Sequence, residues 1–249
     1  MTTAYSGDGI TFPDNTVQAT APRVGMVNRI INGDMRIDQR NAGASGTAVN
    51  QYVVDRFYWQ ASQTGKASWG QNLNAVAPPT GFSNYFGIQS SSAYSLGAGD
   101  YFDLYQNIEG FNTSDLNWGT AYAQTVTLSF WVRSSLADTF SGSVLHPNGS
   151  RGIGFTYLIN LANTWEYKTI TLLGDTSGTW NTDNTGAIRI NICLGVGSTY
   201  GTGTTSWAAQ NIVGLSSGVN FLGTSGATFY LTGVQLEKGS TATDFEYVD

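Results

Sequence analysis

Histidine and cysteine are almost absent from this sequence. His146 and Cys193 are the single residues of their types, so a Ser-His-Asp or Cys-His catalytic arrangement would have to be built around one of them. His146 precedes the turn residues Pro147-Asn148-Gly149, and Cys193 lies within an alternating strand pattern. Nothing in the sequence around either residue indicates a reactive side chain. A single cysteine also excludes an internal disulfide. One histidine and one cysteine also cannot fill the usual zinc tetrahedron.

Charge is equally scarce. Charged residues make up 11% of the chain, against roughly 25% in typical soluble domains. The 11 Lys and Arg residues are scattered singly and the net charge is −6. Because phosphate backbones attract clustered cations, we expect no binding to nucleic acid.

Long apolar segments are missing too. No apolar run reaches the roughly 18 residues that span a membrane. The first residues, Met1-Thr2-Thr3-Ala4, have neither the basic nor the apolar region of a secretory signal. We therefore expect a chain that is neither inserted into a membrane nor secreted through a cleaved signal, and that folds in a reducing cytoplasm.

Glycine and aromatic residues are plentiful instead, at 31 residues and 13%. Strict alternation at 126–132 places Val126, Leu128, Phe130 and Val132 on one face of a strand, and 188–194 alternates in the same way. Gly/Ser/Asn/Asp turns separate these strands from the others. The many short strands predict an all-β sandwich or barrel. The further expected strands are Tyr52–Ala61, Lys66–Asn72, Tyr101–Glu109, Gly152–Leu161, Trp165–Leu172, Trp207–Val213 and Thr228–Glu237.

The first 25 residues differ from the rest. Residues 10–18 show a strand, a turn led by Pro13 and a second strand, and Asn15 tolerates left-handed geometry in that turn. Ala21-Pro22 has the character of a linker. A two-stranded hairpin is only marginally stable alone in water. We therefore divide the chain into an attachment or trimerisation segment, 1–25, and a β-sandwich domain, 26–249.

Three tryptophans adjoin predicted loops: Trp118, Trp180 and Trp207. Aromatic rings can stack on the apolar faces of sugars, while amides and carboxylates bind the hydroxyl groups. Together with Asp183, these tryptophans are our candidate glycan-binding residues. Capping the end of a sandwich or filling a subunit interface is the alternative for the same rings. Trp59, Trp131 and Trp165 lie within strands, and we expect them in the core.

Calcium is the metal that these loops suit best, because it takes carboxylate and backbone oxygens. The candidate ligands are Asn32, Asp34 and Asp244, with Glu246 as an alternative to Asp244. A simple turn at Asn32-Gly33 is the competing interpretation, since Asn-Gly favours tight hairpins.

Several runs in order along the chain resemble phage tail proteins. The run at 10–18, ITFPDNTVQ, resembles a short element that recurs near the starts of tail-fibre segments, with Asn15 in place of the usual glycine. Residues 28–40, NRIINGDMRIDQR, and the following 41–45 resemble the opening of a jelly-roll domain of phage tail proteins. Later strands, loops and the closing segment of that domain are matched by 54–59, 128–134, 165–172, 176–184 and 229–245.

The resemblance implies a jelly-roll β-sandwich akin to carbohydrate-binding modules, in a homotrimer. Such jelly rolls often close with an acidic pair that helps to hold calcium, and Thr232-Gly233 stands in that place here, which weakens the calcium prediction. The resemblance also implies a virion location in the tail or fibre, after assembly in the cytoplasm of a bacterial host.

We therefore expect a tail-fibre or adhesin subunit that binds host surface glycans without catalysis. The segment 1–25 would contact other virion proteins. One alternative is a capsid decoration or tail adaptor protein with a purely structural role. The other is a glycan-depolymerising hydrolase, which would need two carboxylates on either side of the glycosidic bond. The sequence alone pairs no two carboxylates in space.

Overall fold

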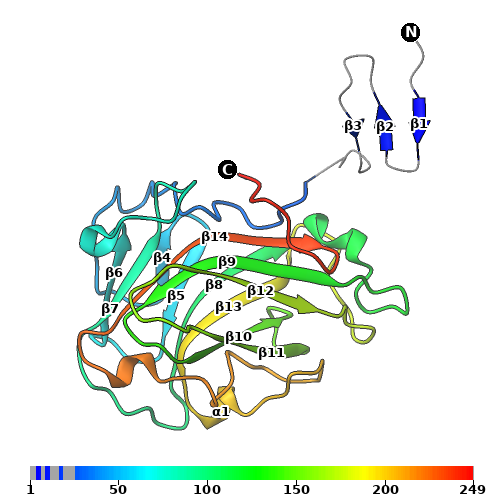
Figure 1. Ribbon diagram of the computed structural model, residues 1–249. Helices are drawn as coiled ribbons and strands as arrows, with labels where there is room; N and C mark the ends of the chain where they lie inside the picture. The colour runs from blue at the N-terminus through cyan, green and yellow to red at the C-terminus, as the bar shows by residue number, and fades with distance from the viewer. Residues whose placement is uncertain (1–3, 7–8, 12–16, 19–25, 249) are drawn as a thin grey trace.

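Two antiparallel β-sheets form the body of the molecule (Figure 1). The computed structural model describes residues 4–6, 9–11, 17–18 and 26–248. One sheet has six strands, in the spatial order β11 (Gly152–Leu158), β10 (Thr139–Leu145), β13 (Gly186–Val196), β8 (Tyr101–Glu109), β5 (Phe57–Ala61) and β4 (Gln51–Val54). The other has five, in the order β12 (Glu166–Leu172), β9 (Val126–Ser134), β14 (Thr228–Lys238), β7 (Phe86–Ser90) and β6 (Ala67–Gln71).

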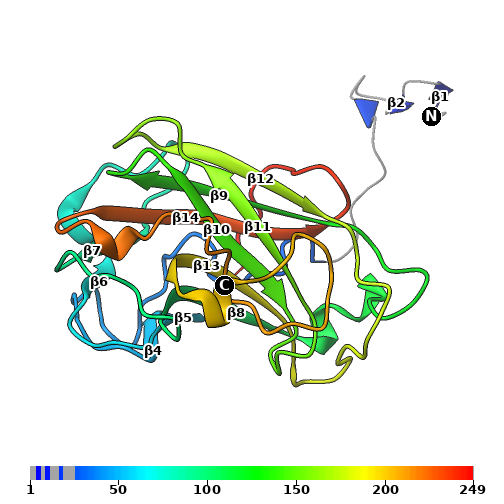
Figure 2. The same ribbon diagram turned by 90° about the horizontal axis from the view of Figure 1, so that it is seen from below.

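The chain passes repeatedly from one sheet to the other. Strands β7, β9, β12 and β14 belong to the five-stranded sheet, whereas β8, β10, β11 and β13 belong to the six-stranded sheet. Each sheet thus pairs strands that are distant in sequence, and the two sheets lie as layers against each other (Figure 2). This arrangement is a jelly-roll β-sandwich, which confirms the predicted fold class.

The core lies between the two sheets. Val126, Leu128, Phe130 and Val132 of β9 have no exposed surface, and the alternating residues of 188–194 in β13 are also buried. Burying a side chain of this size stabilises the fold by about 1.5–3 kcal/mol. The alternation in the sequence therefore predicted correctly which face of each strand joins the hydrophobic core. The opposite face is largely buried too, at Thr127, Ser129, Asn191 and Cys193.

Some strand predictions were wrong. Tyr52–Ala61 is two strands, β4 and β5, joined by a tight turn in which Arg56 has a φ of 72°. Trp207–Val213 is a loop apart from one bridge at Ala208. Its backbone accepts hydrogen bonds from the Ser143 hydroxyl of β10 at 2.8 and 3.0 Å instead of pairing as a strand.

Strands β7 and β10 were not predicted, because both are rich in small residues. In β10, a Cβ atom on Gly142 would lie 2.4 Å from the Asn191 carbonyl oxygen and 2.4 Å from the Phe155 ring. Close packing on neighbouring strands, which a sequence does not display, selects glycine and serine at this place.

Helices are few and short. Among the described residues the one α-helix is α1 (Ser198–Gly201), which follows β13 directly. The 3₁₀ turns are Leu73–Ala75, Gly110–Asn112, Ser114–Leu116 and Phe221–Gly223. In the part of the chain that the structure describes, no helix is long and apolar enough to cross a membrane.

The N-terminal residues form a small sheet of their own. It contains β1 (Ala4–Ser6), β2 (Gly9–Thr11) and β3 (Val17–Gln18), and Ile10 pairs with Gln18 across β2 and β3. The predicted strand pair is therefore present. The intervening turn and the Ala21-Pro22 linker lie outside the described residues, and the domain boundary at 25/26 stays a prediction.

Candidate functional site

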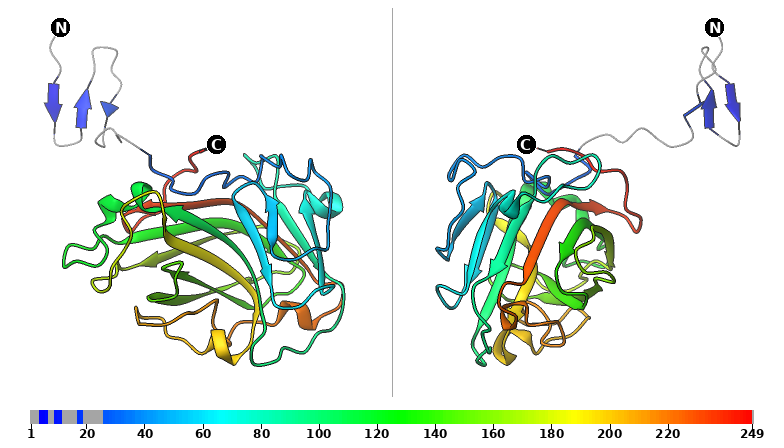
Figure 3. Two further views of the ribbon diagram at one scale, coloured as in Figure 1. Left: turned by 180° about the vertical axis from the view of Figure 1, so that it is seen from behind. Right: turned by 60° about the vertical axis from the view of Figure 1, so that its left-hand side comes forward.

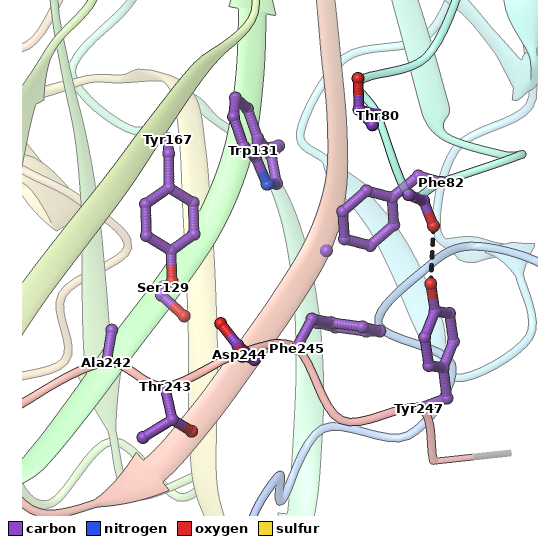
Figure 4. A pocket seen from close by; sticks show the side chains of 12 residues that line it. Thr80, Phe82, Ser129, Trp131, Tyr167, Ala242, Thr243, Asp244, Phe245 and Tyr247 are labelled. Atoms are coloured by element: carbon purple, nitrogen blue, oxygen red, sulfur yellow. Dashed lines mark hydrogen bonds between the residues drawn. The ribbon is translucent and has the colours of Figure 1, made fainter.

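A groove of about 510 Å³ lies on the outer face of the five-stranded sheet (Figure 4). Its volume is within the ~300–1,000 Å³ range of small-molecule sites. Five segments of the chain form it: strands β9, β12 and β14, the loop that precedes β7, and the tail that follows β14. Five aromatic side chains line it: Phe82, Trp131, Tyr167, Phe245 and Tyr247.

Trp131 and Tyr167 form one side of the groove. They are partners in the register of β9 and β12, and their rings are 5.4 Å apart with an interplanar angle of 45°. Side chains alternate between the faces of a strand, so Trp131, between the buried Phe130 and Val132, points outward. Tyr167 is 43% exposed. This side therefore offers ring surface to a ligand.

Phe82, Phe245 and Tyr247 form the other side (Figure 4). The Phe82 and Phe245 rings are 5.1 Å apart, and those of Phe245 and Tyr247 are 4.9 Å apart, both edge to face. The Tyr247 hydroxyl donates a hydrogen bond to the carbonyl oxygen of Gly81 at 2.6 Å. These contacts join the C-terminal tail to the loop before β7 and fix this side of the groove.

Gly233 lies in the floor between the two sides. Its φ is 61°, at an irregularity of β14 between Thr232 and Gln235. A Cβ atom here would lie 2.7 Å from Cζ of Phe82 and 3.1 Å from Cδ1 of Trp131. Glycine is therefore required both by the backbone geometry and by the rings above it.

Polar groups at the groove are an exposed carboxylate and several hydroxyl groups. Asp244 is exposed, and its carboxylate has no hydrogen bond or ion pair with any of the described residues. Ser129 and Thr80 add hydroxyl groups, and the Thr243 hydroxyl donates to Glu237 Oε2 at 2.9 Å. A mainly apolar concavity with a few polar groups is typical of a ligand site.

The tail that carries Asp244, Phe245 and Tyr247 is held by partly buried hydrogen bonds. One oxygen of Glu246 accepts hydrogen bonds from the backbone nitrogens of Val27 and Asn28, at 2.8 and 2.6 Å. The backbone nitrogen of Glu246 donates to Gln235 Oε1 of β14 at 2.8 Å. The tail thus lies beside the segment that begins at residue 26 (Figure 3), and the two segments support each other.

The predicted glycan-binding tryptophans do come together, but as packed rings. The ring centroids of Trp118, Trp180 and Trp207 are 4.8–5.5 Å apart, all edge to face. Trp118 and Trp180 are 7% and 9% exposed, and Trp207 is half-buried against the core. Each indole nitrogen donates to a protein oxygen. The rings cover one another, as expected from the capping alternative, and Trp118 and Trp180 also line a small cavity. Their predicted role toward a glycan stays a prediction.

Asp183 lies in an exposed turn near this cluster. Its Oδ1 accepts hydrogen bonds from the backbone nitrogen of Thr185 at 2.9 Å and from the Thr185 hydroxyl at 2.5 Å. These bonds lower the pKa of Asp183. The side chain stabilises its own turn, and its predicted role toward a glycan stays a prediction.

The predicted calcium ligands have separate structural roles. The Asn32 amide is occupied: its nitrogen donates to the carbonyl oxygens of Ile37 and Asp55, and its oxygen accepts from the Ile37 nitrogen, all within 2.9 Å. Asp34 lies 3.5 Å from Arg36, and Asp244 lines the groove. Across the described ranges, no group of three or more His, Cys, Asp and Glu side chains is suited to a metal. Asn32 therefore acts as a turn residue, the alternative interpretation of Asn32-Gly33.

The expectation for the strand tryptophans was correct for Trp59, which is 1% exposed. It was wrong for Trp131, which lines the groove, and for Trp165, which is half-buried and donates to the carbonyl oxygen of Ala77 at 2.8 Å. The alternation around Trp131 already contained the signal for an outward ring. No pattern in the sequence joins Phe82, Phe245 and Tyr247 to it.

Comparisons with known proteins found no matching family model and no matching curated sequence. Similar solved structures include the enzymatically active domain of tailspike protein 4 from bacteriophage CBA120, with 14% identity over 86% of this chain and a TM-score of 0.42. The chain spans 22% of that tailspike chain. TmCBM61 in complex with β-1,4-galactotriose has 10% identity, a TM-score of 0.42 and coverage of 85% of this chain and 99% of its own.

The family 11 carbohydrate-binding module from Clostridium thermocellum is also similar, with 12% identity and a TM-score of 0.36. It covers 80% of this chain and 98% of its own. Sequence identities of 10–14% show no shared binding residues, so the chemistry of the groove follows from its own side chains.

Proposed function

We propose that this chain is a non-catalytic phage virion protein of the tail-fibre or adhesin type, which attaches to host surface glycans through the aromatic groove. The observation that carries the glycan part is the placement of two sets of aromatic rings on either side of the Gly233 floor, with Asp244 beside them. Sugars present apolar C–H faces to rings and hydroxyl groups to carboxylates, so both kinds of group suit a saccharide.

The groove also supports a role without catalysis. Asp244 is the one acidic residue among the described residues that line it. Hydrolysis of a glycosidic bond by the usual mechanism needs two carboxyl groups, about 5–9.5 Å apart, on either side of the bond. A bound sugar chain would therefore be held and released intact.

The phage part of the proposal rests on the runs of sequence that resemble tail proteins, including ITFPDNTVQ in the N-terminal segment. In this role three chains would associate, and residues 1–25 would attach them to other virion proteins. Three copies of a weak glycan site would act together on a repetitive surface, which raises the overall affinity without new contacts.

The test is binding of the purified chain to a microarray of bacterial surface polysaccharides, with the molar mass measured by light scattering. We expect saturable binding by a trimer to at least one neutral polysaccharide. Trp131→Ala and Tyr167→Ala should each lower the affinity at least tenfold. Tyr122→Ala is the matched control, since Tyr122 is 78% exposed and does not line the groove.

Equal losses of affinity in Tyr122→Ala and in the groove variants would contradict the assignment of the groove as the glycan site. Absence of binding together with tight rebinding to stripped virions would favour the structural alternative. Release of reducing ends from a bound polysaccharide would contradict the non-catalytic role.

A further inference from the structure

A second feature, on the outer face of the six-stranded sheet, is a row of tyrosines with an arginine at each end. Tyr52, Tyr58 and Tyr105 are neighbours across β4, β5 and β8. The Tyr52 and Tyr58 rings are 5.2 Å apart at right angles, and the Tyr58 and Tyr105 rings are 5.1 Å apart and stacked. The guanidinium of Arg40 lies 4.9 Å from the Tyr52 ring, and that of Arg189 lies 4.1 Å from the Tyr105 ring.

Both terminal arginines are free to bind an anion. Arg189 donates its Nε to Asn107 Oδ1 at 2.9 Å, which leaves four of the five N–H groups of its guanidinium for other acceptors. Neither Arg40 nor Arg189 pairs with a carboxylate within the described part of the chain. In a chain of net charge −6, two guanidinium groups without an ion pair, held on tyrosine rings, are hydrogen-bond donors that an anionic ligand can use.

At the Arg40 end of the row, Asp55 lines a neighbouring cavity together with Arg40, Tyr52 and Arg56. At the Tyr105 end, two acidic groups lie near the row and neither neutralises Arg189. Glu109 is already paired with Arg56, at 2.7 Å. Asp103 lies two residues from Tyr105 on β8 and is fully buried. Burial raises the pKa of Asp103 to about 8, although the nearby Arg189 acts in the opposite direction, so this carboxyl group is mostly protonated at neutral pH.

A polar cavity of about 230 Å³ adjoins the row. Tyr52, Arg56, Tyr105, Asn107 and Asn184 are among the residues that line it, and Tyr52 is 40% exposed. The guanidinium of Arg56 is paired with Glu109, which also lines the cavity. Arg189 and Arg40 lie beside the cavity, through their contacts with Tyr105 and Tyr52. The cavity thus combines ring surface and amide groups, with the two unpaired guanidinium groups next to it. Guanidinium groups bind carboxylates through paired hydrogen bonds with a defined geometry.

We propose that this face is a second saccharide site, distinct from the aromatic groove, which binds glycans carrying carboxylate groups, such as chains of uronic acid. The sugar rings would lie against the tyrosines, and the carboxylates would accept hydrogen bonds from Arg189 and Arg40. Because the two arginines stand at opposite ends of the row, an oligomer with several carboxylates binds better than a single uronic acid.

The test is isothermal titration of the full chain with hexameric oligouronates of three linkages, from polygalacturonate, alginate and hyaluronate, each beside a neutral oligosaccharide of equal length. At least one oligouronate should bind, and its affinity should fall severalfold between 50 and 500 mM NaCl, because salt screens exposed charges. Arg189→Gln and Arg40→Gln should each lower the affinity about tenfold or more. Arg189→Lys should also weaken binding, because lysine keeps the charge but lacks the planar fork.

The matched control is Lys66→Gln. Lys66 lies 4.4 Å from the ring of Tyr94, a residue of neither site, so this variant removes the same charge from a similar cation–ring pair elsewhere. It should bind oligouronates like the unmodified chain. Thermal unfolding of every variant shows whether it is folded.

The experiments can disprove either proposed site without disproving the other. Trp131→Ala should lower the affinity for a neutral glycan in the groove at least tenfold and leave oligouronate binding unchanged. Arg189→Gln should lower the affinity for the oligouronate about tenfold and leave binding of the neutral glycan unchanged. The second site is overturned if none of the three oligouronates binds the unmodified chain at millimolar concentration, or if folded Arg189→Gln and Arg40→Gln variants bind as well as the control.

Discussion

Gly233 lies so close beneath Phe82 that a single added carbon would collide with the ring, at 2.7 Å from Cζ. Gly233→Ala should therefore push Phe82 into the groove and lower the affinity for a glycan at least tenfold. Alanine at a φ of 61° should also destabilise the fold by about 1–2 kcal/mol. Titration with the glycan and chemical denaturation measure the two effects.

Gly226→Ala is the control for this variant. Gly226 has a φ of 76°, but a Cβ atom there would meet nothing within 4 Å. Gly226→Ala should lose about as much stability through backbone strain as Gly233→Ala does, and should keep the affinity of the unmodified chain for the glycan. A Gly233→Ala protein that binds like the control would show that the floor does not shape the site.

Trp180 and Trp131 should respond to truncation in opposite ways. Trp180 packs on two other tryptophans and is 9% exposed, so Trp180→Ala should cost about 3–5 kcal/mol of stability and leave glycan affinity unchanged under conditions where the variant is folded. Trp131→Ala should cost less stability and lower the glycan affinity at least tenfold. Denaturant unfolding and glycan titration of both variants, at a temperature where both are folded, test this contrast, and loss of binding in the folded Trp180 variant would argue against it.

Because Asp103 is buried, we expect the free energy of unfolding to fall as pH rises. Its pKa is about 8 in the folded protein, raised mainly by burial, and about 3.9 in an unfolded chain. Between these values the folded state holds a proton that the unfolded state releases, so the stabilising contribution present below pH 4 is lost as pH rises through 8. Asp103→Asn, which is neutral at every pH, should remove this dependence.

The measurement is the free energy of unfolding from pH 5 to pH 8. Over this range the unmodified chain should lose at least about 2 kcal/mol more than Asp103→Asn, since one pKa unit corresponds to about 1.4 kcal/mol. Asp138→Asn, at an exposed position, should keep the slope of the unmodified chain. Parallel curves for Asp103→Asn and the unmodified chain would refute the prediction.

Glu246 should control the side of the groove that the tail forms. Glu246→Ala leaves the backbone nitrogens of Val27 and Asn28 without their acceptor, which should cost about 1–3 kcal/mol. It should also expose residues 240–248 to proteases and lower glycan affinity severalfold. Glu246→Gln retains an acceptor oxygen, so its stability and glycan affinity should lie between those of Glu246→Ala and the unmodified chain. Limited proteolysis with mass spectrometry tests whether the tail is released. An unchanged cleavage pattern in Glu246→Ala would count against a role of Glu246 in holding the tail.

Much of the fold was predictable because a half-buried strand has a period of two. The alternation at 126–132 and 188–194 identified both the strands and the faces that join the hydrophobic core, since successive side chains point to opposite faces of a strand. The predictions failed where small residues meet close neighbours, as at Gly142 in β10, because such packing depends on strands that are distant in sequence.

The candidate site was less predictable. Tryptophans beside Gly, Asn and Ser in the sequence suggested exposed rings, yet Trp118 and Trp180 are covered by each other. Asp244 was noticed as a possible calcium ligand, and the structure places it at the aromatic groove instead. Local sequence describes neighbours along the chain, whereas exposure depends on the loops and tails that fold over each ring.

By itself, the sequence determined an all-β sandwich and the inward faces of its main strands. These properties follow from residue types and short periods. Only the tertiary structure decided which rings form a binding surface, because Phe82, Trp131 and Phe245 come from a loop, a strand and a tail. These segments meet only when the jelly roll places β9 and β14 side by side and Glu246 fastens the tail to residues 27 and 28.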